Sequence, residues 1–292
     1  MNSNRIAESE LILNPDSSIF HLHLHPDQLA DTVLLVGDPG RVNSVSKYFS
    51  KIEHKVENRE FVTHTGIFNG KRITVLSTGI GTDNIDIVVN ELDALVNIDL
   101  KTRTIKEKHS SLNLIRLGTS GSLQKEIPVD SFLMSMYGLG FDGLLNFYQT
   151  NDAVVEKEMT NSFVEHIKWD GKMARPYIVK ASDKLTTLLQ EGMYTGITAT
   201  ASGFYGPQGR ILRLALADAE LNDKLSSFEY KGIKATNFEM ETSALYGLGK
   251  LLGHEACTIC VIIANRIIGQ YSKDYKVPVD KLIQIVLERL TK

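Results

Sequence analysis

Short apolar runs rich in β-branched residues alternate along this chain with segments in which apolar residues recur at helical spacing. The runs predict strands at residues 32–37, 72–77, 112–118, 131–136 and 256–264. The helical spacing predicts helices over 85–96, over about 239–252 with Gly253 just past the end, and over 282–290. Thr82 and Asp83 are the expected N-caps of the first helix. Strands that alternate with helices predict an α/β fold.

Length and composition agree with one folded domain. The chain has 292 residues, of which 42% are hydrophobic and 23% are charged, a balance too apolar for disorder and too polar for a membrane protein. We expect a single domain over 1–292, in which 1–19 form an N-terminal extension. The net charge of −3 gives no overall attraction to nucleic acid or to an anionic membrane. No apolar run has the length of a signal peptide or a bilayer span, so a cytoplasmic location is predicted.

The histidines and cysteines raise the question of a metal site. His21, His23 and His25 alternate with leucine, and on a strand their rings would share one face, as metal ligands require. A metallohydrolase is therefore an alternative, but the other histidines lack ligand spacing and no metal is predicted. Contact of one of these histidines with a substrate hydroxyl is the simpler hypothesis. Cys257 and Cys260 lie three apart on a predicted strand and point to opposite faces, so we expect core residues.

Three glycine-containing loops follow predicted strands, at residues 37–41, 79–81 and 118–121. Ligands of α/β proteins bind at such strand ends, and glycine lets backbone N–H groups approach an anion. Arg41 and Arg116 lie beside two of the loops, and Thr119 adds a hydroxyl, so an anion site is one interpretation. The other is ordinary turns with surface arginines. Nucleoside triphosphate and NAD fingerprints are both absent, because no loop has the required lysine or third glycine.

Two further segments carry groups that could bind an organic substrate. Glu241 lies at the start of a predicted helix, where its carboxylate could bind sugar hydroxyls or only complement the helix dipole. The segment 204–210 combines Phe204, Gln208 and Arg210 in a turn-rich loop. Such a loop could stack on a planar ring and read its edge, or it could be an irregular surface loop.

Taken together, these motifs resemble the nucleoside phosphorylase-I family. The matching motifs are Val36-Gly-Asp-Pro-Gly-Arg41, Asn58-Arg-Glu-Phe61, Ser77-Thr-Gly-Ile-Gly81, Ile115-Arg-Leu-Gly-Thr-Ser-Gly121, Phe238-Glu-Met-Glu-Thr242 and Ile263-Ala-Asn-Arg266, in this order. The resemblance implies a three-layer α/β/α sandwich with a mixed, partly barrel-like central sheet. It also implies a homodimer or hexamer in which neighbouring subunits share each active site.

The resemblance carries a role to each matching residue. Phosphate would be bound by Gly37, Arg41, Arg116 and Thr119, with Arg59 supplied by a neighbouring subunit. Ribose would be bound by Met240 and Glu241, with His21 from the neighbour. The base would be bound by Phe204, Gln208, Arg210 and Arg266. The catalytic groups would be Arg116, Glu241 and Arg210.

The same resemblance implies a pentosyltransferase that cleaves a nucleoside with phosphate, and its base-reading loop is similar to that of the uridine-specific members. The products would be uracil and α-ribose 1-phosphate, with a role in pyrimidine salvage and with deoxyuridine or thymidine as further substrates. Asn265 stands where purine-specific members have an aspartate that protonates the base. The alternatives are a purine nucleoside phosphorylase of the same fold and a non-catalytic nucleoside sensor.

Two positions depart from the family pattern. Asn84 replaces a serine that helps hold a monovalent cation between subunits, so no cation is predicted although Glu60 and Ile80 match. Phosphate is then a co-substrate and no cofactor is expected. Pro207 stands before Gln208, where it could tilt the base-reading loop and shift specificity.

Overall fold

The computed structural model describes residues 5–150 and 153–292 of the chain. Its strands are β1 (Thr32–Val36), β2 (Lys51–Asn58), β3 (Phe61–Phe68), β4 (Lys71–Ser77), β5 (Ile98–Asp99), β6 (Thr104–Ile105), β7 (Asn113–Ser122), β8 (Phe132–Gly140), β9 (Tyr177–Lys180), β10 (Tyr194–Thr200), β11 (Glu229–Tyr230), β12 (Ile233–Glu239), β13 (Glu255–Asn265) and β14 (Gln270–Tyr271). Its α-helices are α1 (Pro39–Ser46), α2 (Thr82–Asn97), α3 (Lys157–Ile167), α4 (Asp183–Leu189), α5 (Leu221–Ser226), α6 (Thr242–Leu251) and α7 (Lys276–Leu290). Three 3-10 turns are η1 (Pro26–Gln28), η2 (Leu144–Phe147) and η3 (Gly206–Gln208).

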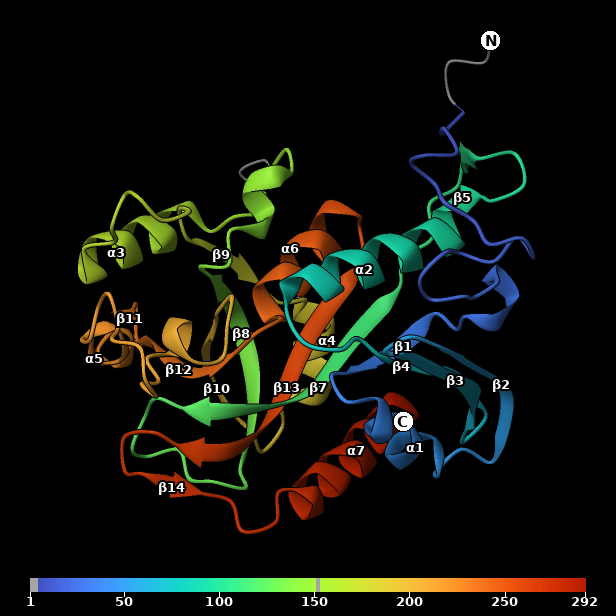
Figure 1. Cartoon of the computed structure of the whole chain (residues 1–292). Helices are drawn as coiled ribbons and strands as arrows, with labels where there is room; N and C mark the ends of the chain where they lie inside the picture. Colours follow the sequence, from blue (N-terminus) through green and yellow to red (C-terminus); the bar gives the residue numbers. More distant parts are fainter. Residues whose placement is uncertain (1–4, 151–152) are drawn as a thin grey trace.

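A mixed sheet runs through the centre of the molecule (Figure 1). Its strand order is β11-β12-β10-β8-β13-β7-β1-β4-β3-β2, and β12 pairs with β7 as well. This extra pairing closes β7, β12, β10, β8 and β13 into a barrel, while β1 to β4 continue as an open sheet. The expected partly barrel-like sheet is confirmed.

Side chains of β1 show how the sheet divides the core. Val33 and Leu35 pack into the cluster that holds the apolar faces of α2 and α6, whereas Leu34 and Val36 pack into the cluster that holds α1 and α7. This alternation follows from the two-residue period of a strand, and because both faces are covered the strand is apolar throughout. Figure 1 shows these helix pairs on opposite sides of the sheet. The predicted three-layer α/β/α arrangement is confirmed.

All five predicted strands and all three predicted helices form, as β1, β4, β7, β8, β13, α2, α6 and α7. The predicted caps of α2 are wrong: the N-cap is Gly81, with φ of 100°, and no side chain caps it. The strand that a metal site at His21, His23 and His25 would require does not form. Residues 21 and 22 lie in a turn, residues 23–25 are irregular, and His23 has φ of 54°, so the side chains do not alternate as they would on a strand.

The N-terminal segment packs on the rest of the molecule. Leu11 and Ile19 are buried in the cluster that contains α2. Residues 1–4 of the predicted extension lie outside the described residues. Within the described part of the chain, no helix is both long and apolar enough to cross a membrane.

Strand direction determines where a site can form. β1 is parallel to β4 and β7, and β7 is parallel to β13. Their carboxyl ends therefore lie at one edge of the sheet, where β1 and β4 lead into the glycine loops at 37–41 and 79–81. The third predicted loop, 118–121, is wrong, because these residues continue β7 and pair with β13.

Candidate active site

A pocket of about 770 Å³ lies at this edge. It is lined by nine of the residues predicted from the sequence: Gly37, Arg41, Arg116, Thr119, Phe204, Gln208, Arg210, Met240 and Glu241. Glu60, Ile80 and Asn84, the positions considered for a cation, line it as well. The fold thus gathers residues more than 200 positions apart in the chain into one cavity.

One end of the pocket is cationic. Arg41 donates to the Leu117 carbonyl oxygen at 3.3 Å and has no carboxylate partner among the described residues. Burial lowers the pKa of Arg41, and the nearby positive charge of Arg116 lowers it further. An oxyanion bound between the two guanidinium groups would relieve this repulsion.

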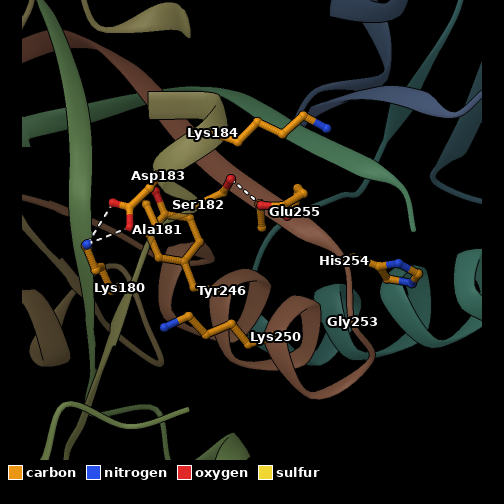
Figure 2. Close-up of a pocket in the computed structure, with 11 residues that line it drawn as sticks. Lys180, Ala181, Ser182, Asp183, Lys184, Tyr246, Lys250, Gly253, His254 and Glu255 are labelled. Carbon is orange, nitrogen blue, oxygen red and sulfur yellow. Dashed lines mark hydrogen bonds and ion pairs between the residues drawn. The ribbon is translucent and has the colours of Figure 1, made fainter. Parts of the chain in front are cut away.

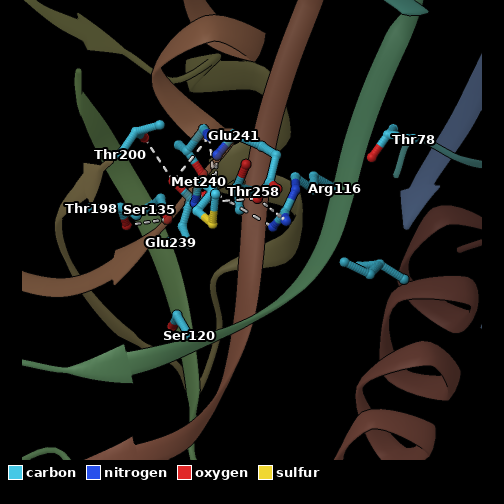
Figure 3. Close-up of polar contacts among 12 residues, drawn as sticks. Thr78, Arg116, Ser120, Ser135, Thr198, Thr200, Glu239, Met240, Glu241 and Thr258 are labelled. Carbon is cyan, nitrogen blue, oxygen red and sulfur yellow. Dashed lines mark hydrogen bonds and ion pairs between the residues drawn. The ribbon is translucent and has the colours of Figure 1, made fainter. Parts of the chain in front are cut away.

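Arg116 lies deep in the pocket wall and contacts two glutamates (Figure 3). It is 5% exposed. Its Nη2 donates to Glu241 Oε2, and its Nη1 lies 3.6 Å from Glu239 Oε2. Burial disfavours the charge of Arg116, but the two carboxylates more than offset this and raise its pKa. Nε and Nη1 are buried and make no hydrogen bond to described residues, so the hydrogen-bonding capacity of the guanidinium is not fully used.

The close fit around Arg116 explains the glycine at position 118 of β7. A Cβ on Gly118 would lie 2.0 Å from Arg116 Nη1. Because no side chain fits there, glycine is required at this position for the guanidinium to reach the two glutamates.

Glu239 ends β12 and holds the start of α6. Its carboxylate accepts hydrogen bonds from the Glu241 N–H at 2.9 Å, from the Thr242 N–H at 3.0 Å and from the Thr200 hydroxyl at 2.7 Å. These backbone groups belong to the unsatisfied first turn of the helix. Burial raises the pKa of Glu239 to about 7; Arg116 opposes this shift and Glu241 adds to it.

Glu241 joins the two sides of the site. One carboxylate oxygen binds Arg116 and the other accepts the Gly81 N–H at 2.8 Å. Glu241 thereby satisfies a backbone donor at the start of α2, which explains why Thr82 and Asp83 are not needed as caps. Met240 is partly buried beside it in the pocket wall.

The opposite end of the pocket is formed by the loop around η3. The Arg210 guanidinium lies 3.7 Å from the Phe204 ring centroid, and its Nη1 donates to Gln208 Oε1 at 2.6 Å. Gln208 is 3% exposed, whereas half of Phe204 is exposed. Burial, followed by the charge of Arg266, lowers the pKa of Arg210 to about 10. A planar apolar ring, an amide and a cation therefore lie together, as the sequence predicted.

Arg266 and Pro207 support this loop. Arg266 does not line the pocket; its Nη1 donates to the Gln208 carbonyl oxygen at 2.5 Å and its Nη2 to that of Gly209 at 3.4 Å. Pro207 occupies the first turn of η3, where no backbone N–H is needed, so it fits without strain. In this structure Arg266 holds the loop backbone rather than facing the cavity.

Asn265 is fully engaged by the backbone. Its amide nitrogen donates to the carbonyl oxygens of Gln124 and Ile127, both at 2.9 Å. Its Oδ1 accepts the N–H groups of Ile267 and Ile268. The side chain is 1% exposed and has no donor left for a ligand.

A second pocket, of about 450 Å³, lies at the other end of β13 and α6 (Figure 2). Its charged groups are largely paired with its own neighbours, Lys180 with Asp183 and Glu255 with the Ser182 hydroxyl. It contains none of the predicted site residues. The first pocket is therefore the candidate active site.

Two histidine groups were tested as metal ligands. His21 Nδ1 lies 2.6 Å from Glu91 Oε1, whereas His23 and His25 face Asp16, so the three rings do not converge. Asp93, His109 and His254 do lie close together. However, the His254 Nδ1 accepts the Leu112 N–H, so the proton of the neutral ring is on Nε2, facing Asp93, and that nitrogen has no lone pair for a metal.

Comparison with known proteins identifies the family. A model of the phosphorylase superfamily matches residues 31–287. The chain belongs to the phosphorylase superfamily. The predicted membership of a phosphorylase family, and with it the prediction of an enzyme, is confirmed.

Individual relatives include proteins named for both classes of base. A uridine phosphorylase from Thermococcus kodakarensis is 28% identical over 262 residues, which are 87% of this chain and 80% of that protein. A DeoD-type purine nucleoside phosphorylase from Clostridium perfringens is 28% identical over 274 residues, which are 92% of this chain and 97% of that protein. A solved Trypanosoma brucei nucleoside phosphorylase, described as showing uridine phosphorylase activity, has a TM-score of 0.83 and 29% identity, covering 96% of this chain and 99% of that chain. Overall identity therefore does not choose the base.

His21 and Arg59, which the resemblance assigned to a neighbouring subunit, do not line this phosphorylase pocket. They lie together at another place: the Arg59 guanidinium is 5.8 Å from the Phe20 ring, and that ring is 4.8 Å from His21. Donation of these two residues to a second copy stays a prediction.

Sequence reasoning missed Glu239 and Tyr271 as pocket-lining residues. Glu239 belongs to the Glu-Met-Glu motif at the start of the predicted helix, but nothing in the sequence distinguished its role from that of Glu241. No pattern pointed to Tyr271, because the β13–β14 pairing that brings it to the pocket joins residues across an irregular loop.

Proposed function

We propose that this phosphorylase cleaves uridine with inorganic phosphate to give uracil and α-ribose 1-phosphate. One observation carries the proposal: a single pocket contains groups suited to each part of the reaction. They are two arginines for an oxyanion, a carboxylate for a sugar, and an amide beside a third arginine for the edge of a uracil ring. A deoxyribose substrate such as deoxyuridine or thymidine would use the same groups.

In this mechanism Arg41, Arg116 and Thr119 hold phosphate beneath C1′, with Gly37 contributing backbone and a partner's Arg59 completing the site. Glu241 accepts hydrogen bonds from the ribose hydroxyls while Met240 packs against the sugar and the partner's His21 reaches the 5′-hydroxyl. This converts a two-substrate encounter into an oriented attack. The oxocarbenium-like sugar is then stabilised between phosphate and the departing base.

The leaving uracil is an anion, so the base end must accept negative charge. Gln208 can bind the N3–H and a carbonyl, and Arg210 can bind the carbonyl oxygens that gain charge. Arg210 already donates to Gln208 Oε1, which orients the amide before substrate arrives. No acid is required at this position.

The engagement of Asn265 supports a pyrimidine rather than a purine. A purine leaving group benefits from a proton at N7, and Asn265 spends both its donors on loop carbonyls. The base specificity proposed here therefore follows from the absence of a free donor at this position and from the Gln208 and Arg210 pair.

The test is an assay of purified protein with uridine or inosine, each with and without phosphate, followed by ultraviolet absorbance of the free base. Uracil release that depends on phosphate is expected. Hypoxanthine release would overturn the base assignment, release without phosphate would indicate a hydrolase, and binding without any release would indicate a sensor.

A further inference from the structure

Glu239 is a second buried carboxylate on Arg116. It is 4% exposed, and its two oxygens accept hydrogen bonds from the Thr200 hydroxyl and from the first backbone N–H groups around α6. One side chain therefore holds both the guanidinium at the oxyanion end and the backbone that carries Glu241.

Arg116 contacts Glu239 and also lines the cavity. Its Nη1 lies 3.6 Å from Glu239 Oε2, makes no hydrogen bond to described residues and belongs to a residue that lines the pocket beside Arg41. A dianion bound by Arg41 and Arg116 would compete for the positive charge that compensates the buried carboxylate. A buried carboxylate that loses its compensating charge is stabilised by taking up a proton.

We propose that Glu239 is a positioning residue that acts through Arg116, and that it takes up one proton from solvent when an oxyanion binds in the pocket. The balance is simple: the dianion enters, a proton adds to a Glu239 oxygen, and no other bond changes. The Thr200 hydroxyl, 2.7 Å away, has two acceptor lone pairs, and one of them receives the Ser243 N–H. The second can accept the new Glu239 O–H. The proposal rests on the proposed function only for the identity of the oxyanion as phosphate.

The ionisable groups that interact with Glu239 come from four of the elements around it, while β10 contributes the Thr200 hydroxyl. They are Arg116 of β7, Glu241 at the start of α6, Cys260 of β13 and Tyr177 of β9. Arg116 is the only cation among them, so the charge state of Glu239 depends on how far that guanidinium is shared. Burial already raises the pKa of Glu239 to about 7, and an oxyanion on Arg116 raises it further. By linkage, the oxyanion binds more tightly at low pH, and its affinity falls as the pH rises through neutrality.

The experiment is titration calorimetry with sulfate, a dianion that does not itself titrate between pH 6 and pH 8.5, in buffers of different ionisation enthalpy. Wild-type protein is expected to take up a fraction of a proton per sulfate, and its affinity is expected to fall by up to about tenfold per pH unit. Glu239→Gln should show no proton uptake and a flat pH profile. Glu229→Gln, which changes an exposed glutamate, is the matched control and should behave as wild type.

A second variant tests the same inference if Glu239→Gln does not fold. Thr200→Val removes both the hydroxyl that lowers the pKa of Glu239 and the acceptor proposed for its new O–H, so near neutral pH the protein should take up less proton per sulfate than wild type. Absence of proton uptake in wild type, persistence of uptake in Glu239→Gln, or failure of sulfate to bind at all would each overturn the inference. Because calorimetry needs no turnover, these results stay separate from failure of the proposed reaction, which the base-release assay reports. In an active enzyme, the phosphate KM of Glu239→Gln should keep only the pH dependence that comes from the ionisation of phosphate itself, whereas wild type should show a further dependence that a purely structural role would not produce.

Discussion

Replacing Gly118 by alanine tests the geometry of the oxyanion end directly. The added Cβ would lie 2.0 Å from Arg116 Nη1 and 3.1 Å from the Cys260 sulfur. Ordinary contact begins at 3.4 Å, so the guanidinium must move by about 1.4 Å. It cannot do so while it keeps its contacts to both Glu239 and Glu241, because both carboxylates are fixed by backbone N–H groups.

The expected loss follows from that displacement. A shift of about 1 Å in a positioning group can cost on the order of 10²-fold in rate, which corresponds to about 2.7 kcal/mol of transition-state stabilisation. We expect Gly118→Ala to lower kcat/KM for phosphate by this factor, while overpacking lowers the free energy of unfolding by about 1–3 kcal/mol. Base release at saturating uridine and chemical denaturation measure the two effects.

Two further variants test whether the clash with Arg116 causes the loss of activity in Gly118→Ala. Gly171→Ala adds a Cβ with no atom within 4 Å and should leave activity unchanged. In an Arg116→Lys background, Gly118→Ala should cost much less than it does alone, because the clashing guanidinium is gone. Wild-type kcat/KM in Gly118→Ala, or full additivity of the two changes, would refute the reasoning.

Three other predictions follow from the site. Glu241→Ala and Arg210→Ala should each lower uridine phosphorolysis by at least about 10²-fold with unchanged circular dichroism, and near-wild-type turnover would contradict their assigned roles. Asn265→Asp places a carboxylate oxygen against two loop carbonyls and should destabilise the fold by about 2–4 kcal/mol without gaining inosine cleavage; measurable hypoxanthine release would show that the position can serve a purine. Arg59→Ala and Glu241→Ala, each inactive alone, should recover about a quarter of wild-type activity after subunit exchange if two subunits share their sites. An inactive mixture would place Arg59 outside the shared site.

Most of the fold could be predicted from periodicity, because both faces of the sheet are covered. Strands such as β1 are then continuously apolar and the helices between them show one apolar face. The errors occurred where local rules compete with distant contacts. Thr82 was a reasonable cap for α2, but Gly81 is the N-cap, and the Glu241 carboxylate, 160 positions away, accepts its N–H. The alternation of His21, His23 and His25 would share one face only on a strand, whereas local turns and the contact with Glu91 determine the conformation of this segment.

The candidate site was predictable to the extent that its residues lie in motifs. Arg41, Arg116, Gln208 and Arg210 stand in or beside segments whose composition suggests binding, and the fold brings them to one cavity. Arg266 shows the limit of such motifs, because its place in the sequence does not reveal that its donors are used by the Gln208 and Gly209 carbonyls. Hydrogen-bond competition of this kind depends on the folded backbone and has no sequence signature.

Glu239 and Glu241 show why two identical side chains, two positions apart, acquire different roles. Glu239 ends a strand and lines the same pocket, but backbone N–H groups fix both of its oxygens, so its charge is tied to the fold and to Arg116. Glu241 begins the helix and shares its carboxylate between Arg116 and Gly81 at the cavity wall, so lone pairs remain for a sugar. Because Arg116 contacts both, occupation of the oxyanion end must alter the charge balance at the sugar end. The two substrates of such a phosphorylase are therefore expected to influence each other's binding through this one guanidinium.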